Sequence, residues 1–155
     1  MPVQVLYDTQ SLPECDLLGI LVTEQRMCGI INNCPLRRRP VPFETMDLYA
    51  ANNRRLRVFI RDANLNIINL TGATGVFTVK LLKSDASPTI QKSTAVPAEG
   101  MIGAADEGEM FFFILPADTD SLDICQYVFD VQVTLADGNV YTTVEGVLNL
   151  LQPVN

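Results

Sequence analysis

The sequence lacks histidine entirely among its 155 residues. Histidine is the commonest general base near neutral pH, so its absence excludes Ser–His and Cys–His nucleophilic pairs. It also removes a usual ligand of zinc and copper. An Asp/Glu pair or one of only three lysines could still act as a base in principle. We nevertheless expect a protein that is not an enzyme and that holds no metal and no cofactor.

Tryptophan is also absent, and only four tyrosines are present. A sugar-binding site built on exposed aromatic rings therefore has little support. No stretch approaches about 18 consecutive apolar residues, so we expect no membrane span. The first residues lack a basic segment followed by an apolar one, which argues against a signal peptide. We expect a chain that is made and folds in a cytoplasm.

The four cysteines are Cys15, Cys28, Cys34 and Cys125. In a reducing compartment the default expectation is free, largely buried thiols. The spacing contains no Cys-x-x-Cys pair, which argues against a zinc site. A Cys28–Cys34 disulfide is open on geometric grounds but has no support from context.

Positive charge is confined to the first part of the chain. Residues 1–61 contain all eight arginines and six acids, a net charge of +2, whereas residues 62–155 carry a net charge of −9. This split predicts a segment that binds an acidic protein surface, and a neighbouring copy of the acidic part is one such surface. Nucleic acid is a poorer candidate, because the acidic remainder would repel phosphates. The alternative is a solvated arginine cluster with no binding role.

Residues 1–52 show no sustained hydrophobic period and are interpreted as an irregular, extended N-terminal docking arm. Pro35, Pro40 and Pro42 favour extended backbone on both sides of Arg37–Arg39. The segment has too few residues for a core of its own, so we expect it to pack on its own domain or on a partner. The candidate partner-binding residues are Leu17, Leu18, Ile20, Ile30, Ile31, Arg37, Arg38, Arg39 and Phe43.

Residues 53–155 are predicted to form the folded domain, because apolar and polar residues alternate from about Arg54 onward. Strands are expected at 56–61, 75–82 and 109–115, and a polar edge strand at 89–95. About seven short strands in roughly 100 residues favour an all-β fold, an Ig-like antiparallel β-sandwich. In the aromatic strand, Phe112 points to one face, while Phe111 and Phe113 point to the other, where they could contact a partner or the arm.

The acidic stretch 118–123 is interpreted as a helical turn capped by Asp or Ser side chains. A calcium site formed by Asp118, Asp120 and Asp123 is the weaker alternative, because their spacing is not that of an EF-hand loop. The last hairpin is predicted to turn through a two-residue type I′ loop at Asp137-Gly138. That loop pairs the following residues: Leu135 with Val140, Val133 with Thr142, Val131 with Val144, Phe129 with Gly146, and Tyr127 with Leu148.

Four features occur in order along residues 47–150. They are Leu70-Thr71-Gly72-Ala73-Thr74, the Gly108 turn before the aromatic strand, Asp118-Thr119 before the strand Tyr127–Asp130, and the Asp137-Gly138 hairpin. Together they resemble the Ig-like domain at the N-terminus of upper baseplate proteins of tailed phages, and related modules of tail and fibre proteins. In that family the domain comes first, whereas here an arm precedes it. The resemblance therefore implies a virion building block rather than a receptor binder.

These observations predict a structural protein of the phage virion, assembled in the host cytoplasm. It would be a tail, baseplate, neck or fibre-attachment component that docks through its N-terminal arm on other virion proteins, as a homo-oligomer or in many copies. One alternative is a capsid decoration or cement protein. A carbohydrate-binding β-sandwich module is a second alternative.

Overall fold

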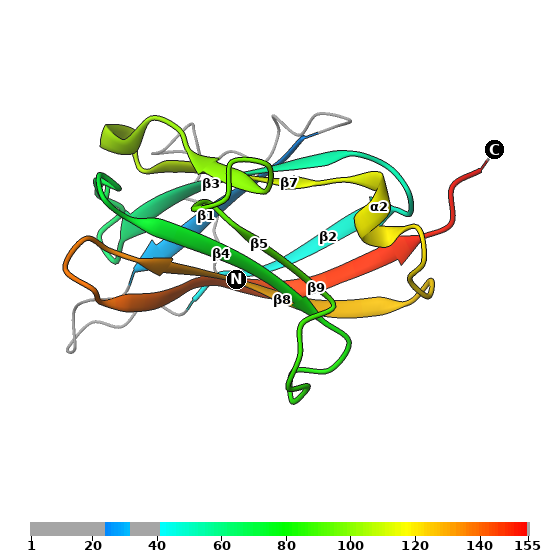
Figure 1. Ribbon diagram of the computed structural model, residues 1–155. Helices are drawn as coiled ribbons and strands as arrows, with labels where there is room; N and C mark the ends of the chain where they lie inside the picture. Colours follow the sequence, from blue (N-terminus) through cyan, green and yellow to red (C-terminus); the bar gives the residue numbers. More distant parts are fainter. Residues whose placement is uncertain (1–23, 32–40, 155) are drawn as a thin grey trace.

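Two β-sheets pack face to face in a computed structural model of the protein, which describes residues 24–31 and 41–154 (Figure 1). Sheet A has the strand order β1 (Glu24–Ile31), β3 (Arg54–Asp62), β7 (Glu109–Ile114), β6 (Gly100–Ile102). Sheet B has the order β2 (Phe43–Tyr49), β9 (Val140–Leu151), β8 (Gln126–Thr134), β4 (Thr74–Lys80), β5 (Ile90–Ser93). Two short helices, η3 (Ala105–Glu107) and α2 (Pro116–Thr119), flank β7 in the sequence. The predicted all-β sandwich is confirmed.

The strand order is that of an immunoglobulin-like domain. β3, β7 and β6 occupy the places of strands B, E and D, and β9, β8 and β4 those of G, F and C. The hydroxyl of Tyr127, at the start of β8, donates a hydrogen bond of 2.9 Å to the carbonyl oxygen of Asp123. This is the tyrosine corner found at the same place in many such sandwiches, and the sequence analysis did not identify it.

The core lies between the sheets and is built by the alternating residues of both. The Phe77 ring lies between Phe112 and Phe129, with centroid separations of 6.0 and 5.7 Å. Phe77 and Phe112 are fully buried. The prediction that Phe112 points into the core is confirmed, and β5 is an edge strand as expected.

The prediction of an irregular arm fails over two stretches of residues 1–52. β1 pairs with β3, and β2 pairs with β9, in both cases in parallel, so the sheets are mixed rather than purely antiparallel. The physical reason is side-chain burial, because Met27, Ile31, Met46 and Leu48 are each at most 1 % exposed inside the sandwich. Residues 1–23 and 32–40 of the predicted arm lie outside the described residues.

The last hairpin follows the predicted register only beyond a bulge. The loop has three residues, 136–138: Leu135 donates its N–H to Asn139, and Gly138 has a positive φ of 89°. The pairs near the turn are therefore shifted by one, with Val133 opposite Tyr141 rather than Thr142 and Thr134, not Leu135, opposite Val140. A bulge at Thr143 compensates for the shift, and the pairs from Val131–Val144 onward are as predicted.

The expected helical turn is present but begins two residues earlier, at Pro116. Asp118 occupies its third position, and its carboxylate accepts a hydrogen bond of 2.7 Å from the N–H of Leu115. The same carboxylate lies 2.7 Å from the ammonium of Lys92, a lysine that is only 6 % exposed. Asp118 therefore holds the turn against β5.

Candidate docking surface

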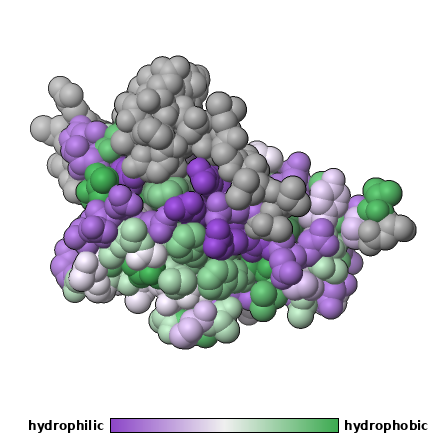
Figure 2. All heavy atoms as spheres, turned by 90° about the horizontal axis from the view of Figure 1, so that it is seen from above, coloured by the Kyte–Doolittle hydropathy of each residue, from purple (hydrophilic) through white to green (hydrophobic). Residues whose placement is uncertain are grey.

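Charged and aromatic side chains alternate on the side of sheet A that points away from the core. We call this surface the Arg–Phe face; Figure 2 views the molecule from this side, and hydrophilic residues gather near its middle. Its members on the four strands are Glu24, Arg26, Cys28, Ile30, Arg55, Arg57, Phe59, Arg61, Met101, Glu109, Phe111 and Phe113.

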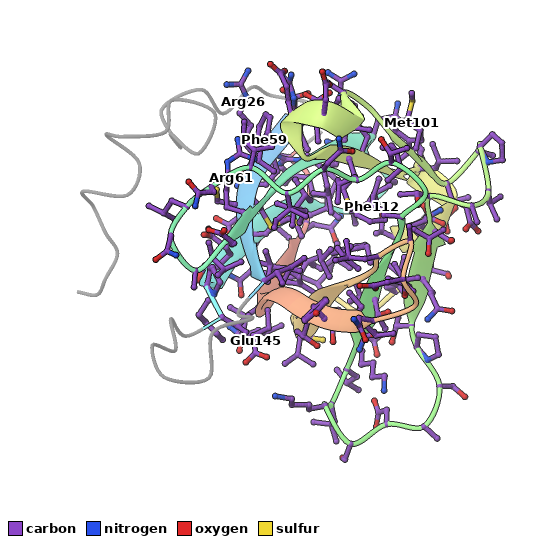
Figure 3. The ribbon with its side chains drawn as sticks, turned by 90° about the vertical axis from the view of Figure 1, so that its left-hand side faces the viewer. Arg26, Phe59, Arg61, Met101, Phe112 and Glu145 are labelled. Atoms are coloured by element: carbon purple, nitrogen blue, oxygen red, sulfur yellow. The ribbon has the colours of Figure 1, made fainter. Side chains whose placement is uncertain are left out.

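The strand register places these side chains in rows. Arg26 of β1 pairs with Arg57 of β3, which pairs with Phe111 of β7, which in turn pairs with Met101 of β6. Residues paired across neighbouring strands project to the same face, so this row crosses the whole sheet. Figure 3 shows Arg26, Phe59, Arg61 and Met101 on one side of Phe112, and Glu145 of sheet B on the other.

Two nearly buried carboxylates anchor the arginines. Glu24 is 2 % exposed and accepts a hydrogen bond of 2.8 Å from Nε of Arg55, while Arg26 Nε lies 3.5 Å from its other oxygen. Glu109 is 7 % exposed and accepts one of 2.7 Å from Nε of Arg57. Charge-assisted bonds of this kind hold the planar guanidinium groups in fixed orientations.

The arginines also stack on the outward-facing rings. The guanidinium carbon of Arg55 lies 5.0 Å from the centre of the Phe111 ring, and that of Arg57 lies 5.1 Å from Phe59 and 5.5 Å from Phe111. Arg61 is fully buried, lies 5.7 Å from the Phe59 ring, and donates to the Ile60 and Glu107 carbonyl oxygens. Stacking and ion pairing together fix the array before any partner arrives.

The chemistry of the array suits recognition of carboxylates. The Arg26, Arg55 and Arg57 side chains remain 27 %, 49 % and 28 % exposed, so part of each is open to solvent. Four arginines against two glutamates leave the face with an excess of two positive charges on a chain whose net charge is −7. Arginine, methionine and aromatic residues are the types enriched in protein–protein interfaces.

The predicted partner-binding residues differ in where the structure places them and in how exposed they are. Ile30 and Ile31 are 4 % and 1 % exposed, so in the folded chain they offer no free contact surface. Phe43 begins the edge strand β2 and is 65 % exposed, so it stays a candidate. The other members, Leu17, Leu18, Ile20, Arg37, Arg38 and Arg39, lie outside the described residues.

From the sequence, all eight arginines were located in residues 1–61, and Phe111 and Phe113 were placed opposite Phe112, but Arg55, Arg57 and Arg61 were not among the candidate binding residues. The sequence analysis missed Glu24 and Glu109, the two carboxylates that order the arginines. The position of Glu109 on this surface could have been found from the sequence, because it lies on the same side of its strand as Phe111. No feature of the sequence could have placed Glu24 there, because its contact with Arg55 depends on a parallel pairing across 31 residues.

The cysteines correct the expectation of free, largely buried thiols in two ways. Cys28 is disulfide-bonded, so the expected free thiol is wrong at this position. Cys125 is free as expected, but it is exposed rather than buried. Within residues 24–31 and 41–154, no three His, Cys, Asp or Glu side chains gather in a way that could hold a metal ion. No helix in the described part of the chain is both long and apolar enough to span a membrane.

Comparison with known proteins yields a likeness of fold. No family model and no curated protein matches the sequence. The solved N-terminal domain of phage TP901-1 ORF48 superposes with a TM-score of 0.54 at 12 % identity, over 84 % of this chain and 100 % of that domain. Two other solved structures align less well. CopC from Methylosinus trichosporium OB3b has a TM-score of 0.34 at 13 % identity, over 72 % of this chain and 89 % of that one. A multicopper oxidase has a TM-score of 0.33 at 8 % identity, over 81 % of this chain and 44 % of that one.

Proposed function

We propose that the protein is a structural component of a tailed-phage virion. The observation that carries the proposal is the likeness of the sandwich to a phage protein domain, which the alignment covers over that domain's full length. The order of sequence motifs over residues 47–150 supports the same assignment independently, because it resembles the Ig-like domain of upper baseplate proteins. A role as a tail, baseplate, neck or fibre-attachment component follows from that resemblance.

The Arg–Phe face supports a role in assembly rather than in catalysis. Its charged groups are held in ion pairs and stacked on rings, an arrangement suited to a pre-formed contact surface. Phe43, exposed on the edge strand β2, adds an apolar contact at one edge of sheet B. We propose that other virion proteins dock on residues 1–61, which contain all eight arginines.

Purified particles test this proposal. We expect gradient-purified, nuclease-treated phage particles to contain the protein at a fixed copy number relative to the tail proteins, measured by quantitative mass spectrometry. A protein that remains in the soluble host lysate and is absent from particles would contradict the proposal. A copy number of hundreds per particle would instead favour capsid decoration, whereas baseplate, neck and fibre-attachment components are limited to small multiples set by the symmetry of the tail.

A further inference from the structure

The backbone of β2 turns every second residue away from the rest of sheet B. Among the described residues, β2 is the last strand of this sheet and pairs only with β9. The N–H of Glu145 donates to the carbonyl oxygen of Pro42 at 3.0 Å, and the N–H of Ala50 donates to that of Leu151 at 2.9 Å. Because residues alternate in direction along a strand, the even-numbered residues bond to β9. The N–H and C=O groups of residues 43, 45, 47 and 49 therefore face away from β9.

The same four residues carry exposed side chains. Phe43 and Tyr49 are 65 % and 44 % exposed at the two ends of β2, and Thr45 and Asp47 between them are exposed as well. Lysine, proline and bulges often protect sheet edges. Residues 43–49 contain no lysine, arginine or proline, and their register with β9 is continuous. An edge of this kind suits the addition of another strand.

The sequence of β2 is complementary to itself in the antiparallel direction. With a two-fold axis at Met46, Phe43 lies opposite Tyr49 of a second copy, and Thr45 lies opposite Asp47 of that copy. All four outward-facing backbone positions then form hydrogen-bonded pairs, which gives roughly eight bonds between the copies. Aromatic pairs are favourable across strands, and a threonine hydroxyl can donate to the carboxylate opposite it.

The two acids of β2 select this register over its neighbours. With the axis at Met46, Glu44 lies opposite Leu48 of the second copy, so no acid faces another acid. An axis at Asp47 would place two copies of this carboxylate against each other, which is unfavourable. An axis at Thr45 would leave Tyr49 beyond the end of the facing strand. The register about Met46 therefore makes the most bonds and opposes no like charges.

We propose that β2 is the contact between two copies of this chain, which pair antiparallel about a two-fold axis at Met46. The contact would join two five-stranded sheets into one continuous sheet, with the same patch used on both copies. The inference does not rest on the proposed function, and β2 lies outside the Arg–Phe face. A strand of a different protein could also satisfy the backbone groups, whereas a second β2 supplies an aromatic ring opposite Phe43 and Tyr49 at both ends.

Sedimentation velocity of the full-length protein tests the proposal. We expect a dimer whose share rises between about 1 and about 200 µM protein. All samples carry Cys125→Ser, which excludes dimers linked through this exposed thiol. Thr45→Asp places an acid opposite Asp47 twice in each dimer and should raise the dissociation constant about tenfold. Thr45→Lys places a cation there and should lower that constant about threefold at low salt.

The matched controls are Thr74→Asp and Thr74→Lys. Thr74 is an exposed residue at the start of β4, which β8 and β9 separate from β2 within the same sheet. These variants change the net charge of the chain by the same amounts as the Thr45 variants. We expect them to alter the dissociation constant by less than about twofold, because charge far from the contact is screened by salt.

Three results would overturn the proposal. A native protein that stays monomeric up to about 200 µM would show that the chain does not pair with itself, and would leave the edge to a different protein. Dimers of unchanged strength in both Thr45 variants would place the contact elsewhere. Weakening by Thr45→Lys as strong as that by Thr45→Asp would show that position 45 faces its own copy, which contradicts the axis at Met46.

Discussion

The two outer faces of the sandwich differ in how their charged side chains are arranged. On sheet A, opposite charges alternate with aromatic rings, and Glu24 and Glu109 are nearly buried against arginines. On sheet B, neutral amides and an acid form a hydrogen-bonded row that is open to solvent: Gln126 donates to Asn149 at 3.0 Å, and Asn149 donates to Asp47 at 2.9 Å. Both faces belong to one fold, so the difference reflects side-chain choice rather than backbone architecture.

Sheet B also leaves like charges facing each other. Asp130 of β8 pairs directly with Glu145 of β9. Burial raises the pKa of Asp130, and the neighbouring Glu145 raises it further. Directly opposed acids are unfavourable, and Lys80 and Lys83 only partly offset their effect on the pKa of Asp130, whereas the Arg–Phe face is electrostatically complementary within itself. Of the two outer faces, the Arg–Phe face is the one whose charged groups are ordered by nearly buried partners, and that side is where we place binding.

The largest difference is expected between neighbouring rings of β7. Phe112→Ala should lower the free energy of unfolding by about 3–5 kcal/mol, because it opens a cavity in the core. Phe111→Ala, on the Arg–Phe face, should cost only about 1 kcal/mol through lost stacking of Arg55 and Arg57. Urea denaturation of both variants measures the difference. Equal losses would show that the outer face is packed like a core.

The next effect concerns the attachment of β2 to sheet B. A side chain at Gly146 of β9 would clash with the backbone carbonyl of Glu44, so Gly146→Ala should destabilise the protein by about 1–3 kcal/mol. Thr45→Ala, an exposed change on β2, is the control and should stay within about 0.5 kcal/mol. If residues 43–49 were a detached arm, the two variants would be equally stable in thermal and urea unfolding.

The ion pairs of the two faces should differ in strength. Arg57→Ala leaves the nearly buried Glu109 without its main partner and should cost about 1–3 kcal/mol. Lys83→Ala removes an exposed partner 3.9 Å from Glu145 and should cost less than about 0.5 kcal/mol. A double-mutant cycle of Arg57 with Glu109 isolates the pair itself. A coupling energy near zero would show that the Arg57–Glu109 ion pair is no stronger than the exposed pair near sheet B.

The tyrosine corner predicts a loss of stability at alkaline pH. Burial raises the pKa of Tyr127 to about 12 in the folded protein, against about 10 in the unfolded chain. Its contribution is therefore complete below pH 10 and is lost as the pH rises toward 12, because only the unfolded state releases the proton in that window. Tyr127→Phe should cost about 1 kcal/mol at neutral pH, through the lost bond to Asp123, and should flatten this decline. An equally steep decline in the variant would refute the assignment.

The smallest expected effect is a gain in stability from a substitution on sheet B. Asp130→Asn should stabilise the protein at neutral pH by about 0.5 kcal/mol, because it removes the repulsion by Glu145. The pKa of Asp130 is raised in the folded state, so the penalty arises as the pH rises through that pKa and is absent below the ordinary pKa of aspartate. The substitution should therefore raise the melting temperature at neutral pH and leave it almost unchanged near pH 3. Destabilisation at neutral pH would contradict the comparison of the faces.

The sequence predicted those elements whose side chains alternate over a long run. β3, β4, β7, β8 and β9 were recognised because one face of each is apolar, and the strand count led to the Ig-like sandwich. β1 was missed because its apolar residues include Ile30 on the outer face, and β2 because the prolines before it favoured an extended arm. Parallel pairing with strands far along the chain leaves no local signal. The Arg–Phe face depends on the parallel pairing of β1 with β3, so the outward rings of β7 could be predicted but the place of Glu24 and Arg26 beside β3 could not.

A cryo-EM reconstruction of purified particles would show whether the Arg–Phe face is an assembly surface. We expect an ordered Ig-like sandwich at a symmetry-defined position in the virion, with Arg26, Arg55 and Arg57 covered by polypeptide. Particles without density for this domain, or with the domain present and those three arginines open to solvent, would contradict it.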